Sequence, residues 1–292
     1  MRRLLEVLQA ASDYLAGKGV ENPRLVTEQL MSHVLKCPRL QLYVRFESEL
    51  DEAQLAALRA GVRRLAAREP LQYVVGETDF MGRRFKVDRR ALIPRPETEI
   101  LVETLLQDGS VWTAPAPAVA DVGTGSGCVA ISLALAHPEA RLTGLDASEE
   151  ALDLARANAE LNGVAGRMTF RLADLVAGVE PGILDAVVAN LPYIPSADCD
   201  GLPPHIRNHE PRTALDGGAD GLRVIFRLVG AAWSVLKEGG GLFLETGCDQ
   251  ACAVSDLMTA HGYRGVETRQ DLAGRDRIVM GRRAGSGESA CR

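Results

Sequence analysis

The segment Asn190-Leu191-Pro192-Tyr193 follows an apolar run from Leu184 to Ala189, and its residue types suit chemistry on a planar NH2 group. Such a group is a poor nucleophile, because its lone pair is delocalised into the neighbouring π-system. The side-chain oxygen of Asn190 and the backbone carbonyl of Leu191 can accept its two hydrogens, which frees the lone pair for in-line attack on a methyl group. Pro192 restricts Leu191 to extended dihedrals, and the ring of Tyr193 can pack on the planar group. We therefore predict that Asn190, Pro192 and Tyr193 are catalytic and that all four residues bind the substrate.

A glycine-rich loop follows the apolar run from Ala118 to Val122 and precedes a stretch of helical periodicity. Glycines there permit a tight turn and let the backbone approach a ligand at a helix N-terminus. The spacing G-x-G-x-G differs from the dinucleotide fingerprint G-x-G-x-x-G, whose third glycine falls on Cys128. Asp121 comes just before the loop, where a carboxylate can meet the charged amino-acid end of a sulfonium cofactor. The loop residues predicted to bind that cofactor are Gly123, Thr124, Gly125, Ser126 and Gly127.

Two more acidic residues follow expected strands and extend this cofactor site. Asp146 ends the run from Leu142 to Leu145, where a carboxylate can accept both hydroxyls of a ribose. The alternative is that Asp146 caps the helix that begins near Ser148. Asp174 and Leu175 follow the third strand, and Asp174 suits contact with an adenine amino group; a cap or turn role is its alternative. Asn190 completes the predicted cofactor-binding set.

The elements that must position these residues alternate between strand-like and helical runs. Strands are expected at residues 118–122, 141–145, 168–172, 184–189, 241–245, 262–267 and 277–280. This alternation indicates an α/β fold with a Rossmann-like seven-stranded, mostly parallel sheet covered by helices on both faces. The last two strands lack an intervening helix, so an antiparallel hairpin is expected at the edge. Asn190 and the glycine loop would then share the carboxyl edge of the sheet, which argues against an ordinary strand-ending turn at Asn190.

Residues 1–70 form a small N-terminal domain in this interpretation, because apolar residues recur at helical spacing within residues 3–17, 25–35 and 55–67. Pro70 is expected to end the third helix. Residues 71–92 alternate around Gly76 and Gly82, which predicts a β-hairpin linker. A helix is expected after Ile93-Pro94-Arg95-Pro96, with Glu97 in its first turn. The α/β domain should span residues 93–282, and residues 283–292 should form a disordered tail.

Composition excludes several functional classes. The net charge of -6 and the sequence pI near 5.5 provide no global attraction to phosphate backbones, so stable nucleic-acid binding is not expected. The six cysteines lack the paired short spacings of a zinc site, so no metal is expected. No secretory segment begins the chain and no apolar window reaches the length of a membrane span. A reducing cytoplasm fits best.

With these motifs, the sequence resembles the HemK-type protein-(glutamine-N5) methyltransferases that modify peptide-chain release factors, over nearly the whole chain. The most specific parts are Gln72-Tyr73 with Gly76, Leu92 to Glu99, the glycine loop, and Glu210 to Gly218. The resemblance implies a class I methyltransferase sheet with an N-terminal substrate-recognition domain. It further implies that Gly123 to Gly127 and Asp146 bind S-adenosyl-L-methionine, which leaves as S-adenosyl-L-homocysteine. Asn190 to Tyr193 would hold the glutamine of a Gly-Gly-Gln motif in class 1 release factors, the expected partners in translation termination.

One departure keeps alternatives open, because the family motif Asn-Pro-Pro-Tyr has Leu191 in place of its first proline. The resulting Asn-Leu-Pro-Tyr motif resembles that of ribosomal RNA adenine dimethyltransferases. The alternative function is therefore that of an adenine-N6 methyltransferase acting on RNA or DNA. Those enzymes carry their helical extension after the catalytic domain, whereas here it comes before. A noncatalytic cofactor-binding module is a third hypothesis, and the intact Asn190, Pro192 and Tyr193 count against it. Arg95 and Glu97 either help to close the site or only begin a helix.

Overall fold

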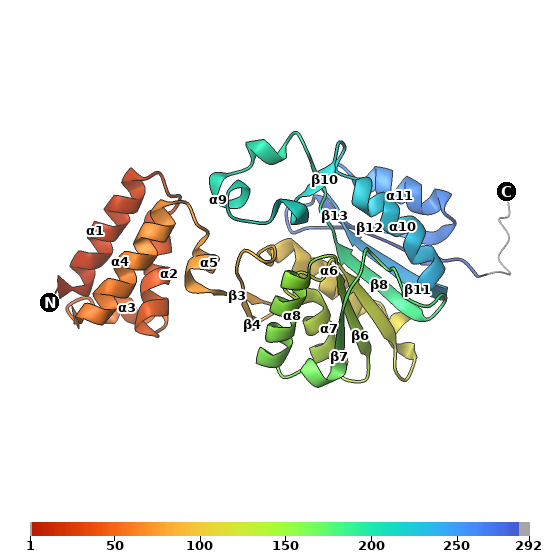
Figure 1. The fold of residues 1–292 in the computed structure, drawn as a ribbon, viewed down its shortest axis with the longest axis horizontal. Coiled ribbons are helices and arrows are strands. Elements are labelled where there is room, and N and C mark those ends of the chain that lie inside the picture. Colours follow the sequence, from red (N-terminus) through yellow and green to blue (C-terminus); the bar gives the residue numbers. More distant parts are fainter. Residues whose placement is uncertain (1, 286–292) are drawn as a thin grey trace. The chain divides into compact units, whose positions relative to one another are not determined.

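Residues 2–285 are described in the computed structural model, where they divide into two units (Figure 1). The first unit comprises Met1–Glu77 and Pro203–His209, and the second comprises Thr78–Leu202 and Glu210–Arg292. Of the expected tail, residues 286–292 lie outside the described residues, whereas Arg283 still belongs to the last strand. The part of the tail prediction that covers Arg283 is therefore wrong.

The first unit is mostly helical, and α1, α2 and α4 confirm the helices that the apolar spacing predicts. Its elements are β1 (Arg2–Arg3), α1 (Leu4–Gly17), α2 (Pro23–Leu35), α3 (Arg39–Val44), β2 (Glu49–Leu50), α4 (Glu52–Ala66), α5 (Leu71–Val75) and α9 (Pro204–Arg207). Leu4 and Leu8 are buried on one face of α1 and pack in one core with Leu30 of α2 and Leu58 of α4. A capping box at Asp51 fixes the start of α4.

Residues 71–75 form α5 rather than part of a hairpin, which corrects the sequence-based expectation. Pro70 stands at the N-cap, and Gly76 ends the helix in the left-handed region at φ 80°. Tyr73 is buried, and the neighbouring apolar side chains pack against the core of the first unit. The sequence alone does not distinguish a helix from a strand in this short apolar run. Burial on the core of the first unit favours the helix.

The remainder of the expected linker does form a hairpin. Strands β3 (Glu77–Phe80) and β4 (Arg83–Lys86) pair with each other. The turn between them is Met81-Gly82, with φ values of 50° and 67°. Positive φ at both central residues suits the twist of a two-residue hairpin. Phe80 and Phe85 are buried and meet edge to face, with ring centroids 6.0 Å apart.

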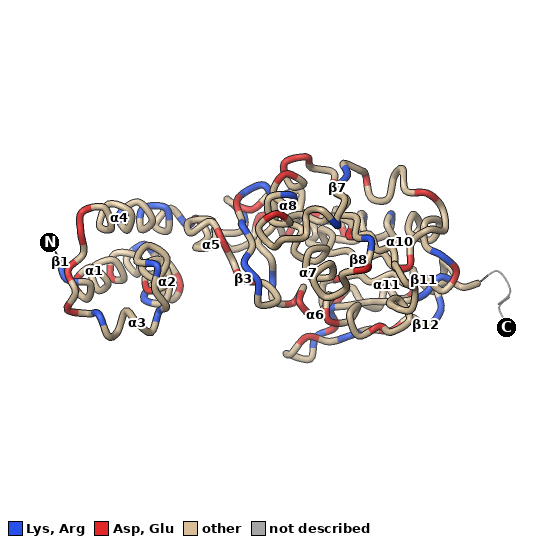
Figure 2. The backbone as a smooth tube through the Cα atoms, turned by 90° about the horizontal axis from the view of Figure 1, so that it is seen from below, with Lys and Arg blue, Asp and Glu red and all other residues tan. Residues whose placement is uncertain are grey.

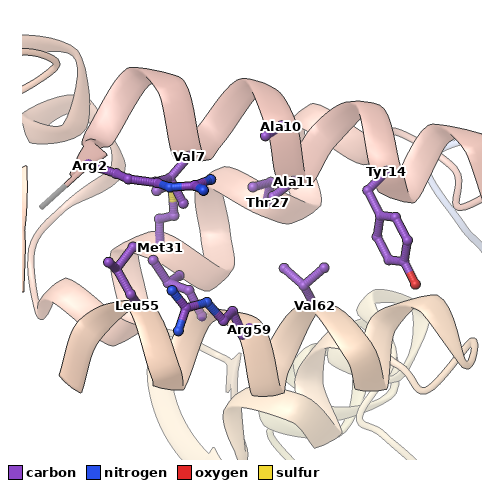
Figure 3. Close-up of a pocket in the computed structure, with 11 residues that line it drawn as sticks. Arg2, Val7, Ala10, Ala11, Tyr14, Thr27, Met31, Leu55, Arg59 and Val62 are labelled. Atoms are coloured by element: carbon purple, nitrogen blue, oxygen red, sulfur yellow. The ribbon is translucent and has the colours of Figure 1, made fainter. Parts of the chain in front are cut away.

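A mostly apolar groove of about 220 Å³ lies in the first unit (Figure 3). Val7 and Tyr14 of α1, Met31 of α2, and Leu55 and Val62 of α4 line it. Figure 3 shows these side chains reaching from three helices toward a common space. The first unit therefore keeps an apolar depression between helices that otherwise pack closely.

The second unit is built on a seven-stranded sheet in the order β12-β13-β11-β8-β5-β6-β7. Its strands are β5 (Ala118–Val122), β6 (Arg141–Asp146), β7 (Met168–Leu172), β8 (Leu184–Asn190), β11 (Leu236–Glu245), β12 (Tyr263–Gln270) and β13 (Asp276–Arg283). Strands β11, β8, β5, β6 and β7 run parallel to one another, while β13 pairs antiparallel with both β11 and β12. The predicted sheet and its antiparallel edge hairpin are confirmed, although β11 begins earlier than expected.

Helices cover both faces of this sheet, as Figure 1 shows. They are α6 (Pro96–Gln107), α7 (Cys128–Ala136), α8 (Glu149–Leu161), α10 (Arg223–Val235) and α11 (Ala251–Ala260). Val119 of β5 faces a core shared with α6 and α7, whereas its neighbour Ala120 faces a core shared with α10 and α11. Alternation of side chains along each strand thus supplies both cores.

Candidate active site

The carboxyl ends of four neighbouring strands bring the predicted site residues together. In the register of the sheet, Val122 of β5 lies opposite Ala189 of β8, so the glycine loop and Asn190 begin side by side. Asp146 ends β6, the other neighbour of β5. Glu245 at the end of β11 lies opposite Asn190. This edge of an open α/β sheet is where such folds bind ligands.

Close contacts require glycine at two positions of the loop. Gly123 has φ +72°, and a Cβ there would lie 2.9 Å from Cδ2 of Leu191. Gly127 has φ +80° at the N-cap of α7, and a Cβ there would lie 3.1 Å from Cβ of Ala155 in α8. The first glycine therefore lets Leu191 pack on the loop, and the last lets α7 approach α8.

Asp121 faces the inside of the loop. The Thr124 hydroxyl donates to Asp121 Oδ2 at 2.7 Å and the Ala130 N–H donates to the same oxygen at 3.2 Å. Complete burial raises the pKa of Asp121 to about 7, against the lowering effect of these two donors. The carboxylate thus ties the loop to the start of α7, a role that sequence reasoning did not assign.

Asp146 bridges the glycine loop and α8. Its Oδ2 accepts from the Gly125 N–H and its Oδ1 from the Ser148 N–H, both at 2.9 Å. The alternative that Asp146 caps α8 is wrong, because Ser148 occupies the N-cap and its hydroxyl accepts from the Ala151 N–H. Each carboxylate oxygen can accept more than one hydrogen bond, so acceptor capacity remains on this partly exposed side chain.

Asp174 lies at the surface after β7. Nη2 of Arg227 in α10 donates to Asp174 Oδ2 at 2.6 Å, and both side chains are more than half exposed. An exposed pair of this kind contributes about 0–1 kcal/mol, so Asp174 can exchange this partner for another at little cost. Leu175 beside it has φ 55° and packs on the sheet core.

The backbone of Pro192 and Tyr193 is packed between a glycine-rich turn and Gln250. A Cβ on Gly217 would lie 2.6 Å from the Pro192 carbonyl oxygen, and one on Gly221 would lie 2.2 Å from that of Tyr193. Gln250 Nε2 donates to the Tyr193 oxygen at 2.9 Å. The short parallel pair of β9 (Ile194–Pro195) and β10 (Asp216–Gly218) continues this contact. The segment after residue 210 therefore supports the Asn190 to Tyr193 segment directly.

Asn190 and Tyr193 both connect to Glu245. Asn190 Nδ2 donates to Thr98 Oγ1 at 2.9 Å, and Thr98 Oγ1 donates to Glu245 Oε2 at 2.7 Å. The Tyr193 hydroxyl lies 3.4 Å from Glu245 Oε1. Burial raises the pKa of Glu245 to about 7, although the hydroxyl of Thr98 opposes this shift. Desolvation also raises the pKa of Tyr193, so its hydroxyl stays protonated.

Sequence reasoning missed Thr98 and Glu245, although each carried a signal. Thr98 lies in the first turn of α6, inside the Leu92 to Glu99 segment that stood out in the sequence. Glu245 ends a strand at the same edge as Asn190, which is the position that made Asn190 a candidate.

Arg95, whose role was left open, forms an ion pair with a buried carboxylate. Its Nη2 donates to Glu210 Oε1 at 2.5 Å, and the Ile93 N–H donates to Glu210 Oε2 at 3.1 Å. The Glu210 side chain is fully buried. The ion pair therefore connects the segment before α6 to the segment that supports Tyr193.

The described part of the chain contains neither a candidate metal site nor a helix that could span a membrane. Among residues 2–285, no cluster of three or more His, Cys, Asp or Glu is placed to hold a metal ion. Within the same range, no helix is long and apolar enough to cross a membrane.

Known proteins resemble this chain along nearly its full length. Residues 6–76 match the family model described as PrmC N-terminal domain, and residues 96–200 match that of the methyltransferase small domain. A relative from Geobacter sulfurreducens named release factor glutamine methyltransferase is 44% identical over 278 residues, which is 95% of both chains. One from Moorella thermoacetica with the same name is 43% identical and covers 95% of this chain and 97% of its own.

A solved methyltransferase from Pyrococcus furiosus shares the fold, with a TM-score of 0.52 and 16% identity over 80% of this chain and all of that one. The chain has a seven-stranded methyltransferase fold, a helical N-terminal unit matching the PrmC model, and extensive identity with these relatives. It therefore belongs to the release factor glutamine methyltransferase family.

Proposed function

We propose that the protein transfers a methyl group from S-adenosyl-L-methionine to the N5 amide nitrogen of the glutamine in the Gly-Gly-Gln motif of class 1 release factors. The observation that carries this proposal is the placement of Asn190 directly beside the glycine loop, with Leu191 packed against Gly123. An NH2-holding segment and a cofactor-type loop then meet at one edge of the sheet. The names of the relatives supply the class of substrate.

The residues present fit the cofactor. S-adenosyl-L-methionine supplies an electrophilic methyl group when it is bound. The loop from Gly123 to Gly127 brings backbone close to the sheet edge, and the spare acceptors of Asp146 suit a ribose diol. Asp174 and Leu175 are assigned to the adenine, since the ion pair of Asp174 with Arg227 is weak and exposed. We assign Thr124, Ser126 and Asn190 to the same site.

The chain itself contributes orientation rather than a strong base. We assign the Asn190 side-chain oxygen and the Leu191 carbonyl to the two hydrogens of the substrate amide. With both hydrogens held, the nitrogen lone pair is directed out of the amide plane toward the methyl group. The Tyr193 ring packs on the amide, and Pro192 keeps the Leu191 carbonyl in place. Held dipoles of this kind stabilise the charge that develops on the amide.

We assign recognition of the release factor to the helical N-terminal unit, and catalysis to the unit that carries the seven-stranded sheet. The apolar groove lined by Val7, Met31 and Val62 gives the N-terminal unit a surface for an apolar side chain of the partner.

We assign the protein to the cytoplasm, where release factors act, and expect no stable complex with nucleic acid. Lys and Arg are interspersed with Asp and Glu along both units (Figure 2), and the net charge is -6. Such a distribution provides no strong general attraction to phosphate backbones. The adenine-N6 alternative is not favoured, because the relatives that cover the whole chain are named for release factor glutamine.

Methylation assays with three substrates test this proposal. The wild-type protein and labelled cofactor are incubated with a release factor, with the same factor carrying Gln→Ala in its Gly-Gly-Gln motif, and with ribosomal RNA. We expect one methyl group on the motif glutamine of the first substrate and none on the others. Label on RNA, or equal label on the two release factors, would contradict it.

A further inference from the structure

The side-chain amide of Asn190 ends a chain of hydrogen bonds that leads into the protein. Nδ2 of Asn190 donates to Thr98 Oγ1 at 2.9 Å, and Thr98 Oγ1 donates to Glu245 Oε2 at 2.7 Å. Thr98 is 2% exposed and Glu245 is 1% exposed, so water does not compete for either group. The three residues come from α6, β8 and β11.

The direction of these bonds follows from the chemistry of the groups. An ionised carboxylate only accepts hydrogen bonds, so the single proton of the Thr98 hydroxyl must point at Glu245. The hydroxyl oxygen then has only lone pairs left for Asn190. A lone pair attracts the NH2 end of the amide and repels its oxygen. The amide of Asn190 therefore has one favoured orientation, with Oδ1 turned away from Thr98.

That orientation determines what the site can bind. Oδ1 of Asn190 is free to accept a hydrogen bond, whereas a flipped amide would present a donor. A substrate NH2 group offers donors only, so it matches the first orientation and clashes electrostatically with the second. An unpaired donor facing another donor in a closed site costs about 1–3 kcal/mol.

We propose that Thr98, held by Glu245, is a positioning residue that keeps Oδ1 of Asn190 toward the substrate and so makes the site specific for an NH2 group. The proposal rests on the proposed function in that it assumes Asn190 contacts the amide that is methylated. Glu245 also lies within 3.4 Å of the Tyr193 hydroxyl, so one buried carboxylate positions both ends of the Asn190 to Tyr193 segment.

Variants at Thr98 separate this role from a general structural one. Thr98→Val keeps the shape and removes the hydroxyl, and Thr98→Ser keeps the hydroxyl. Ser132→Ala is the matched control, because it removes another buried hydroxyl of the same unit, which donates to the Cys128 carbonyl. Thr98→Ala replaces Thr98→Val if the latter does not fold.

The first measurement is NMR of the Asn190 side-chain amide in the free protein, assigned by its absence in Asn190→Ala. In wild type and Thr98→Ser, we expect one protected amide proton. In Thr98→Val, its exchange with water should be faster by about tenfold or more, because the acceptor is lost. Unchanged exchange would overturn the proposal, whatever the protein methylates. This readout needs no substrate, so it is independent of the proposed function.

The second measurement is methyl transfer to the release factor in a double-mutant cycle. Thr98→Val should lower kcat by about tenfold or more, with cofactor affinity nearly unchanged, and Thr98→Ser and Ser132→Ala should stay near wild type. In the Asn190→Ala background, Thr98→Val should have no further effect, because it acts through Asn190. An equal loss in both backgrounds would contradict the proposal, whereas an inactive wild type would contradict only the proposed function.

Discussion

Glu245 should make stability and activity respond to pH in opposite directions. Burial raises its pKa from 4.5 to about 7 in the folded protein. Between those values the folded state binds more protons than the unfolded state, so the free energy of unfolding falls as pH rises. A shift of this size corresponds to about 3 kcal/mol, most of it lost between pH 5 and pH 8.

Activity should rise over the same range. Only ionised Glu245 must accept from Thr98, whereas a protonated carboxyl can donate to it and release the preferred orientation of Asn190. One pH unit below this pKa, Glu245 is ionised in about one protein molecule in ten. The kcat should therefore be roughly tenfold lower at pH 6 than at pH 8.

Neighbouring charged and polar groups shift the pKa of Glu245 and so determine the pH at which stability and activity change. Arg277 lowers its pKa, as do the hydroxyls of Thr98 and Tyr193, and Glu97 raises it. Neither hydroxyl ionises near neutral pH, and Arg277 stays charged. A single transition near pH 7 is therefore expected from this group.

Glu245→Gln removes the titration with little change of shape, and Ser132→Ala serves as the control. Urea unfolding from pH 5 to pH 8 should show a shallower loss of stability in Glu245→Gln, although part of the slope remains because the pKa of buried Asp121 is also about 7. Its kcat should be low and nearly independent of pH. If Glu245→Gln kept the wild-type pH profile of kcat, the assigned role of Glu245 would be wrong.

Three further substitutions test separate parts of the site. Asp146→Ala should weaken cofactor binding by about 1.5–3 kcal/mol in calorimetry, and an unchanged Kd in a folded variant would leave Asp146 only its contacts to Gly125 and Ser148. Leu191→Pro should keep kcat within about tenfold because the carbonyl remains, yet lower stability by about 1–3 kcal/mol because the buried leucine packs on Gly123; unchanged thermal unfolding would contradict that packing. Gly217→Ala should lower stability and kcat together, since its Cβ would lie 2.6 Å from the Pro192 oxygen, and a fully active, stable variant would refute the close approach.

Much of the catalytic unit could be predicted from the sequence because its central strands β5 and β8 are buried on both faces. Such strands read as largely apolar runs; β5 comes directly before Gly123, and β8 ends at Asn190. The order of the elements then places these residues at one edge. Helices α1, α2 and α4 of the first unit were predicted for a similar reason, since each buries one apolar stripe.

What could not be predicted depends on contacts between distant segments. Leu71 to Val75 has no local pattern that separates helix from strand, and packing on the first core decides. The roles of Thr98 and Glu245 require that α6 begins beside the end of β11, a contact spanning 147 positions. Gly217 likewise gains its role only from the approach of Pro192.

The most direct test of the central claim is methyl transfer by Asn190→Ala with the release factor as substrate, with folding and cofactor Kd measured on the same sample. The account predicts that kcat falls by about a hundredfold or more, while cofactor affinity falls much less, because the Asn190 oxygen orients the substrate amide in the transition state. A folded Asn190→Ala protein that methylated the release factor at the wild-type rate would contradict it, and Asn190 would then be only the end of a strand.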